Sequence, residues 1–461
     1  SFMITWIRTG ISKPKGYDEE MIKGIFKDGE LGKDGIYTPG EDDDTDVGDT
    51  PNIIFLQLES FVDPTIVKDM EYSQDPVPNF RRMVKEYSSG ALTVPAVGAG
   101  TANVEFEAIT GISARFFGPG EYPNKSVLTE KTCESTAFDL KQVGYSAHAI
   151  HNHRGAFYNR NTVFKNLGFD TFTCLEYMNN VMKTPKNWAK DALLTENILD
   201  ALNSTEGKDY IYTISVQGHG KYPSEEVITN PTIKVTKAPD EETKWAYEYY
   251  VNQIYEMDIF IKELTDALSE YDEEVVLVFY GDHLPALDMA EENITTGDLY
   301  QTQYVIWSNF GMEKQDRDLA TYEISSHVLK RLGISVGLLN KYHQNYEGKQ
   351  KYLDNLEALS YDMLYGKEYI YGGKSPFKPS DMRMGVKEIK IDSVVKIGER
   401  YYIKGENFTE YSKISLDGEI LKTTYLGPTI LALSEEVDPA RVKEMKVSQV
   451  EKNKEILSTT E

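Results

Sequence analysis

Two acidic segments of the chain follow apolar runs and could bind a metal ion. Glu59 comes directly after the apolar run at residues 52–58, and the adjacent pair Asp282 and His283 comes just after a second run at residues 275–280. Carboxylate oxygens and an imidazole nitrogen form a mixed ligand set that suits a hard or borderline divalent cation. The sequence therefore predicts a site for Mn²⁺, Mg²⁺ or Zn²⁺.

A hydroxyl group that could act with such a cation lies between these segments. Thr101 follows the turn Gly98-Ala99-Gly100 and precedes an apparent helix that ends near Thr110. A hydroxyl bound to a divalent cation loses its proton more easily, so Thr101 could be a nucleophile at neutral pH. The amides at the start of the helix would face a phosphoryl oxygen.

Each of these residues also has a purely structural interpretation. Glu59 could be a turn residue, Thr101 a helix N-cap, and residues 282–283 a loop pair. What favours the functional interpretation is that all of them fall at predicted carboxyl ends, where an α/β sheet has its site.

The elements that must position these residues are short apolar strands that alternate with amphipathic helices. The predicted strands cover 52–58, 146–150, 210–216, 275–280 and 304–307, and the clearest helices cover 190–202 and 241–270. Alternation of this kind predicts an α/β fold with a mostly parallel central sheet and helices on both faces. Ligands bind such sheets at the carboxyl ends of the strands.

The composition divides the chain into three parts. Residues 1–50 are polar and end in an acidic, glycine-containing run, which predicts a solvated arm or linker. Residues 51–378 would form the catalytic domain. Residues 379–461 contain short strands separated by turn residues, which predict a small C-terminal β-sandwich. Within it, residues 403–408 and 416–418 resemble immunoglobulin-like modules of the IPT/TIG type.

The segments around Glu59, Thr101 and Asp282-His283 resemble those of lipoteichoic acid synthase and related phosphoglycerol transferases. These enzymes have a sulfatase-like fold and belong to the alkaline phosphatase superfamily. The resemblance covers roughly residues 51–365. It implies that Glu59, Thr101, Asp282 and His283 bind one Mn²⁺ and that Thr101 attacks phosphatidylglycerol. A covalent glycerophospho-threonine would form, diacylglycerol would leave, and a glycerol-phosphate polymer or glycolipid would accept the group.

The resemblance also implies a substrate pocket. The stretch from residue 151 to 160 is similar to a family segment whose His, Trp and Arg line the glycerol-phosphate pocket, which assigns substrate binding to His151, Tyr158 and Arg160. Tyr158 stands in place of the family's Trp. A guanidinium can grip a phosphate with two parallel hydrogen bonds. His219 resembles a phosphate-contacting histidine and could also protonate the leaving alkoxide.

Two acids on the predicted helix after Thr101 are assigned a structural role. Glu105 and Glu107 lie at positions i and i+2, so they cannot face one site together.

Other activities remain open. A true sulfatase would carry its nucleophile in a C/S-x-P-x-R motif, but Cys133 is followed by Glu-Ser-Thr-Ala. Phosphoethanolamine transferases usually have several disulfides, which two cysteines cannot supply. The remaining alternatives are a transferase or hydrolase for another phospho-headgroup or a sulfate ester, and a non-catalytic relative that binds glycerol phosphate or wall polymer.

Composition narrows the partners and the location. The chain has 49 Lys and Arg against 74 Asp and Glu, a formal net charge of −25, which argues against nucleic-acid binding. Cys133 and Cys174 do not make a disulfide-rich scaffold, and whether they pair is open. No apolar run reaches 18 residues. The resemblance places this domain outside a bacterial cell, behind membrane helices that this sequence lacks, and we expect a monomer.

Overall fold

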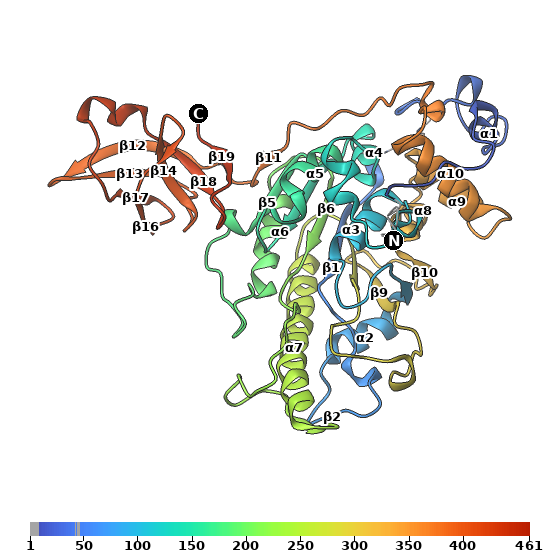
Figure 1. Cartoon of the computed structure of the whole chain (residues 1–461), viewed down its shortest axis with the longest axis horizontal. Helices are drawn as coiled ribbons and strands as arrows, with labels where there is room; N and C mark the ends of the chain where they lie inside the picture. Colours follow the sequence, from blue (N-terminus) through green and yellow to red (C-terminus); the bar gives the residue numbers. More distant parts are fainter. Residues whose placement is uncertain (1–8, 42, 44–46) are drawn as a thin grey trace, which may run out of the picture.

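The central strand of the fold, β1 (Asn52–Leu58), is apolar and fully buried within a nine-stranded sheet (Figure 1). The computed structural model describes residues 9–41, 43 and 47–461. The sheet order is β10-β3-β9-β8-β1-β6-β4-β5-β11. The strands are β3 (Ser88–Thr93), β4 (Ser146–His151), β5 (Thr171–Cys174), β6 (Asp209–Ile214), β8 (Val275–Gly281), β9 (Gln301–Ser308), β10 (Leu319–Ala320) and β11 (Arg383–Met384).

The sheet is mostly parallel, as predicted, and β9 runs antiparallel to both β8 and β3. Alternate residues of β1 enter two separate cores: Ile53 and Phe55 face one, and Ile54, Leu56 and Leu58 face the other. This alternation follows from the two-residue period of a strand. The α/β architecture with helices on both faces is therefore confirmed.

Helices cover each face. The face of Ile54 packs against α2 (Pro78–Glu86), α6 (Leu194–Leu202) and α7 (Glu241–Ser269). The face of Phe55 packs against α3 (Thr101–Thr110), α4 (Thr136–Gln142), α5 (Arg160–Asn166), α8 (Thr321–Arg331), α9 (Leu338–Tyr346) and α10 (Tyr352–Leu364). A short antiparallel pair, β2 (Glu71–Tyr72) and β7 (Val235–Lys237), adds to the first face. The helix expected over 190–202 begins as a 3-10 turn at Asp191–Leu193.

Two four-stranded antiparallel sheets follow at the C-terminus and project from the α/β domain (Figure 1). One has the order β12-β13-β17-β16 and the other β15-β14-β18-β19. The strands are β12 (Lys390–Ile397), β13 (Arg400–Glu406), β14 (Ser412–Leu416), β15 (Glu419–Ile420), β16 (Thr423–Gly427), β17 (Ile430–Leu433), β18 (Lys446–Val450) and β19 (Ile456–Thr459). Ile403 and Leu431 from one sheet share a core with Ile414 and Val447 from the other. Both sheets thus enclose one small core.

The N-terminal segment differs from the expected solvated arm. Residues 1–8, 42 and 44–46, which include much of the acidic run, lie outside the described residues. The rest contains α1 (Glu19–Lys23), and Ile22 and Tyr37 are buried in the core of the α/β domain. The Phe26 ring lies 5.9 Å from that of Tyr342 in α9. Scattered apolar residues in a polar stretch give no clear period, which is why their burial escaped the sequence pattern.

A buried carboxylate joins the two helices beside β8. Asp258 in the middle of α7 accepts hydrogen bonds from the backbone amides of Asn79 (3.0 Å) and Phe80 (2.7 Å) in the first turn of α2. Val77, the N-cap residue of α2, provides no side-chain cap. The Asp258 carboxylate, which belongs to α7, therefore caps the N-terminus of α2.

We predict that Asp258→Ala destabilises the α/β domain by about 1–3 kcal/mol, because two buried amides lose their acceptor. Calorimetry of the intact chain should show a lower Tm. The matched control is Asp266→Ala on the exposed side of α7, whose ion pair with Lys262 is exposed to solvent and contributes about 0–1 kcal/mol. Equal effects of the two variants would contradict the role of Asp258.

Candidate active site

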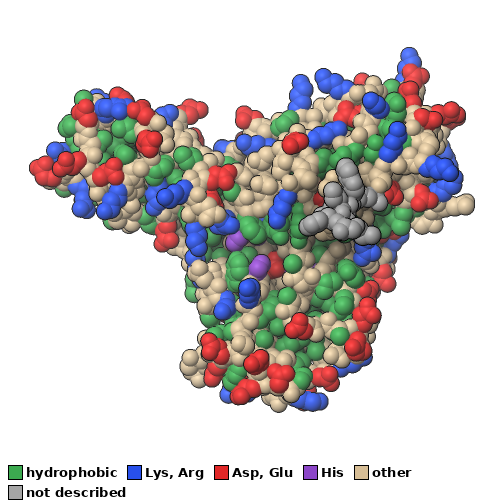
Figure 2. Space-filling model, viewed as in Figure 1, with side chains coloured by type: hydrophobic (Ala, Val, Ile, Leu, Met, Phe, Trp, Pro, Cys, Tyr) green, Lys and Arg blue, Asp and Glu red, His purple; other side chains and the backbone are tan. Residues whose placement is uncertain are grey.

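The register of four parallel strands brings the chemistry-bearing residues to one edge of the sheet. Leu58 of β1 pairs with Gly281 of β8, so Glu59 and Asp282 leave the sheet side by side. On the other side of β1, Gln57 pairs with Ile214 of β6, and Ile214 pairs with His151 of β4. The segments after these strands line a cavity of about 650 Å³. In Figure 2 histidine side chains are visible in a hollow bordered by hydrophobic side chains.

The strand end at Gly281 leaves no room for a side chain. A Cβ atom there would lie 1.8 Å from the carbonyl oxygen of Phe61. The close approach lets the amide of Asp282 donate to Leu58 O at 3.0 Å, and Asp282 Oδ1 in turn accepts from the amide of Ser60 at 2.8 Å. Glycine at this position therefore locks the two acidic strand ends together.

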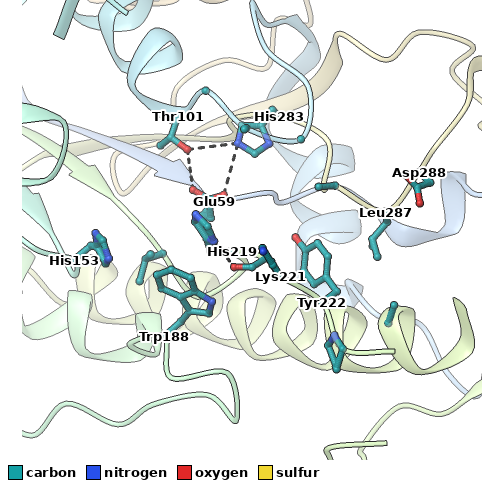
Figure 3. A pocket seen from close by; sticks show the side chains of 18 of the residues that line it. Glu59, Thr101, His153, Trp188, His219, Lys221, Tyr222, His283, Leu287 and Asp288 are labelled. Carbon is teal, nitrogen blue, oxygen red and sulfur yellow. Dashed lines mark hydrogen bonds and ion pairs between the residues drawn. The ribbon is translucent and has the colours of Figure 1, made fainter. Parts of the chain in front are cut away.

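Thr101 is the first residue of α3, not its N-cap. The N-cap is Gly100, whose φ of 108° strongly favours glycine. The Thr101 hydroxyl donates to Glu59 Oε2 at 2.9 Å and lies 3.4 Å from His283 Nε2, and the three side chains point toward one another (Figure 3). Gln57 of β1 holds the start of the helix by donating to Thr101 O at 3.1 Å. The structural interpretation of Thr101 as a cap does not describe this arrangement.

The two carboxylates and the imidazole are buried and close together. Within the described parts of the chain, Glu59, Asp282 and His283 form the one group of His, Cys, Asp and Glu side chains whose ligand atoms all lie within 4.8 Å. Asp282 Oδ2 has no hydrogen-bond partner among the described residues, and His283 Nε2 lies 3.5 Å from it. A buried carboxylate oxygen without a donor costs free energy. A divalent cation would provide the missing partner, so the residues fit a metal ion.

The charges in this cluster also indicate a site for a divalent cation. Burial and the nearby Glu59 raise the pKa of Asp282 to about 7. Burial lowers the pKa of His283, but the charges of Asp282 and Glu59 outweigh that effect and the net pKa is raised. His283 Nδ1 donates to Leu284 O at 2.9 Å, which leaves Nε2 directed at the carboxylates. The excess of negative charge is what a cation would neutralise.

The predicted pocket residues surround this cluster. His151, Tyr158, Arg160 and His219 all line the same cavity. His151 Nδ1 donates to Ile214 O at 2.8 Å, while burial and the nearby Arg160 hold the pKa of His151 well below its usual value. A neutral ring with Nδ1 protonated has Nε2 as a hydrogen-bond acceptor.

The sequence predicts a two-pronged contact between Arg160 and a phosphate. In the structure, Arg160 makes a contact of this kind with Glu105. Its Nε lies 3.1 Å from Glu105 Oε2, its Nη2 lies 2.5 Å from Oε1, and both side chains are 1% exposed. Glu107 points elsewhere and accepts from the amide of Ala114 at 2.8 Å. The prediction that Glu105 and Glu107 do not face one site is confirmed, but Glu105 orients a pocket residue rather than only supporting the fold.

Several lining residues were missed by the sequence analysis. Trp188, from the loop before α6, stacks 4.2 Å from the His219 ring and 5.6 Å from the His153 ring. Lys221 lies beside His219 in the cavity wall (Figure 3). No motif surrounds Trp188, whereas Lys221 could have been found from its place two residues after His219. Lys221, Arg154 and Arg160 bring positive charges to the cavity wall, where Arg154 is paired with Glu451 and Arg160 with Glu105.

The cysteines take no part in this site. Cys133 and Cys174 are both buried and both free. Among the described residues no helix is long and apolar enough to cross a membrane.

Comparison with known proteins gives the same fold. The sequence model of the family described as Sulfatase matches residues 51–334. A phosphoglycerol transferase of Streptococcus pyogenes, GacH, solved in complex with sn-glycerol-1-phosphate, superposes with a TM-score of 0.65 at 22% identity, covering 80% of this chain and 100% of that one.

Two curated proteins of Rhizobium meliloti (strain 1021) are also similar. A putative cyclic beta-1,2-glucan modification protein is 30% identical over 363 residues, which is 69% of this chain and 55% of that protein. The capsular polysaccharide biosynthesis protein RkpI is 25% identical over 245 residues, 52% of this chain and 42% of that protein. The chain thus spans about half the length of these relatives.

We predict that Asp282→Asn lowers the affinity for Mn²⁺ at least tenfold, because it replaces the partnerless carboxylate oxygen by a neutral amide. Isothermal titration calorimetry with MnCl₂ measures the change. Glu107→Gln is the matched control, since burial raises the pKa of Glu107 to about 8 and the amide mimics its neutral form. Unchanged Mn²⁺ binding in Asp282→Asn would exclude this cluster as the metal site.

Proposed function

The chain belongs to the sulfatase family, and from that premise we propose that it transfers glycerol phosphate from a phosphatidylglycerol-like lipid to a cell-surface acceptor. The acceptor is a polymer, glycolipid or glycan, and the group passes through a phospho-threonine intermediate. The observation that carries this proposal is the buried Thr101 hydroxyl at the start of α3, 2.9 Å from Glu59. Glu59 clusters with Asp282, whose Oδ2 has no hydrogen-bond partner among the described residues.

Thr101 is the proposed nucleophile. Its Oγ1 attacks the donor phosphorus, a bond forms between them, and the bond from phosphorus to the diacylglycerol oxygen breaks. The hydroxyl proton already points at Glu59 Oε2, which can hold it as the attack begins. The amides at the start of α3 lie near the same hydroxyl and favour negative charge on a phosphoryl oxygen.

Glu59, Thr101, Asp282 and His283 would hold the cation, for which we propose Mn²⁺, with Mg²⁺ or Zn²⁺ as alternatives. When bound, a divalent cation makes a hydroxyl more acidic and neutralises charge on the phosphate oxygens.

The wall of the cavity supports a glycerol headgroup. His151 offers an acceptor nitrogen, which suits a hydroxyl and not the oxygen of an anion. Arg160, fixed by Glu105, and Lys221 supply positive charge for the phosphate. His219 lines the same cavity and would give a proton to the leaving diacylglycerol alkoxide, and Tyr158, also in the wall, would contact the headgroup.

The names of similar proteins agree with this reaction. The Streptococcus pyogenes protein is a phosphoglycerol transferase, and the Rhizobium meliloti relative is described as modifying a glucan. We propose that the domain over residues 51–378 carries the reaction, outside a bacterial cell at its membrane, as a monomer.

Sulfate-ester hydrolysis is the main alternative enzyme activity. It is disfavoured because Thr101 occupies the nucleophile position and because the buried Cys133 has no C/S-x-P-x-R context. A binding protein without turnover is the non-catalytic alternative, and an intact Thr101 argues against it.

We predict that Thr101→Ala abolishes Mn²⁺-dependent release of diacylglycerol from phosphatidylglycerol, because the nucleophilic oxygen is removed. Mass spectrometry of the parent protein should find a glycerophosphate adduct on Thr101. Thr101→Ser, which keeps the hydroxyl, serves as the control and should retain measurable release. Release by Thr101→Ala at the parent rate would refute the phospho-threonine route.

We predict that His219→Gln slows transfer from phosphatidylglycerol about 10²- to 10⁴-fold, the usual contribution of a general acid. The same variant should cleave the 4-nitrophenyl ester of glycerol phosphate at nearly the parent rate, because 4-nitrophenolate leaves without a proton. His327→Gln, which alters a histidine outside the cavity, is the control. An equal loss with both donors would assign His219 to binding and not to proton transfer.

A further inference from the structure

A second cavity, of about 310 Å³, lies between the catalytic domain and the C-terminal sheets. We call it the module groove. One wall is the loop of residues 154–159 together with Lys125. The other wall is the turn between β18 and β19, which contributes Glu451, Asn453 and Glu455. The groove exists only because the C-terminal sheets pack against this loop.

The contacts that close the groove are specific. Glu451, whose side chain is 1% exposed, pairs with Arg154 at 3.2 Å. Asn161 donates to Glu455 Oε1 at 3.0 Å. Deeper in the interface, Thr409 Oγ1 and Gln449 Nε2 both donate to Glu176 O at 2.6 Å. Buried polar contacts of this kind fix the position of the module relative to the loop.

The module groove adjoins the catalytic cavity. Both are lined by Arg154, Phe157 and Tyr158. A row of rings connects them: Phe157 lies 5.0 Å from His153, which is followed by Trp188 and then His219 at 5.6 and 4.2 Å. A ligand in the groove would therefore approach the catalytic centre from the side of His219.

The shared loop is held in an unusual conformation. Tyr158 and Asn159 have φ values of 56° and 54°, in the left-handed region that non-glycine residues rarely adopt. Asn159 Nδ2 donates to Asn124 O at 3.1 Å, and the Gly155 amide donates to Glu176 Oε2 at 3.1 Å. Strained residues that the surroundings hold in place are typical of binding sites.

The groove has no spare positive charge. Arg154 is paired with Glu451, and Lys125 lies over the rings of Tyr122 and Tyr158, 4.9 and 4.7 Å from their centroids. Glu451 and Glu455 balance these two cations. An anionic polymer would gain little here, because the two carboxylates of the lining offset its two cations.

A neutral sugar fits this lining better. Phe157 is 37% exposed and gives the groove an apolar surface against which the C–H face of a sugar can pack, beside the Arg154 guanidinium that lies 5.5 Å from the ring centroid. The carboxylate of Glu455 and the amides of Asn159 and Asn453 can accept from and donate to hydroxyl groups.

We propose that the module groove is the acceptor subsite and that it binds a neutral glycan, an inference that rests on the proposed transfer. A sugar hydroxyl enters the catalytic cavity and forms a bond to the phosphorus of the phospho-threonine. The bond from phosphorus to Thr101 Oγ1 breaks, and the hydroxyl proton ends on Oγ1. The product is a glycerol-phosphate ester of the glycan, and the C-terminal sheets select the acceptor.

The test is direct binding to the intact chain, which does not depend on donor chemistry. The probes are cyclic β-1,2-glucan, linear neutral gluco-oligosaccharides and a glycerol-phosphate oligomer, each titrated by calorimetry. We expect at least one neutral glycan to bind, and the anionic oligomer to bind more weakly than that glycan. Asn453→Trp should weaken the binding of the glycan at least tenfold, because the larger side chain fills the groove. Lys452→Trp, an exposed neighbour that does not line the groove, is the matched control.

The kinetic arm separates this proposal from the proposed function. Asn453→Trp should raise the KM for the glycan at least tenfold while release of diacylglycerol without acceptor stays within twofold of the parent. The proposal would be overturned if none of the neutral glycans bound. It would also be overturned if Asn453→Trp left glycan binding unchanged, or if the glycerol-phosphate oligomer bound more tightly than the glycans. If the parent protein released no diacylglycerol, the proposed donor reaction would be refuted, but glycan binding in the module groove would not.

Discussion

The structure depends on holding two carboxylates side by side in its interior. Glu59 and Asp282 follow neighbouring parallel strands whose register pairs Leu58 with Gly281, so the sheet holds the backbones of the two residues side by side. The resulting negative charge, with one oxygen of Asp282 lacking a hydrogen-bond partner among the described residues, is unfavourable unless a cation binds. The fold thus holds two carboxylates close enough to repel each other, and a divalent cation between them would reduce this repulsion.

Charge is distributed differently around this centre than over the whole chain. The protein carries a formal charge of −25, yet the cavity is lined by as many Lys and Arg (Arg154, Arg160 and Lys221) as Asp and Glu (Glu59, Glu242 and Asp288). Arg160 is fixed by Glu105, which prevents the guanidinium from adapting freely to a ligand. A cation fixed before the ligand arrives loses little conformational freedom on binding, which favours selection by shape.

The C-terminal sheets are part of this arrangement. They contact the loop of residues 154–159 through the pair of Arg154 and Glu451. They also hold the backbone oxygen of Glu176, whose side chain accepts from the Gly155 amide of the loop. Asn159, which follows the left-handed Tyr158, donates to Asn124 O in the α/β domain. A module distant in sequence therefore contributes to the geometry of the pocket as well as to its outer wall.

The sequence by itself determined four neighbouring strands of the parallel sheet, β1, β4, β6 and β8, and the residues at their ends, because buried apolar runs are local signals and Glu59, Asp282 and His283 directly follow two of them. It did not indicate β3, β5, β10 and β11, which lack a long apolar run. The sequence also showed that Glu105 and Glu107 do not face one site, because residues two positions apart on a helix point in different directions. Only the tertiary structure decided that Glu105 pairs with Arg160, that Trp188 packs on His219, and that the N-terminal segment is buried. These contacts join residues far apart in the chain, and they are set by strand register and by packing between layers, which no short stretch of sequence encodes.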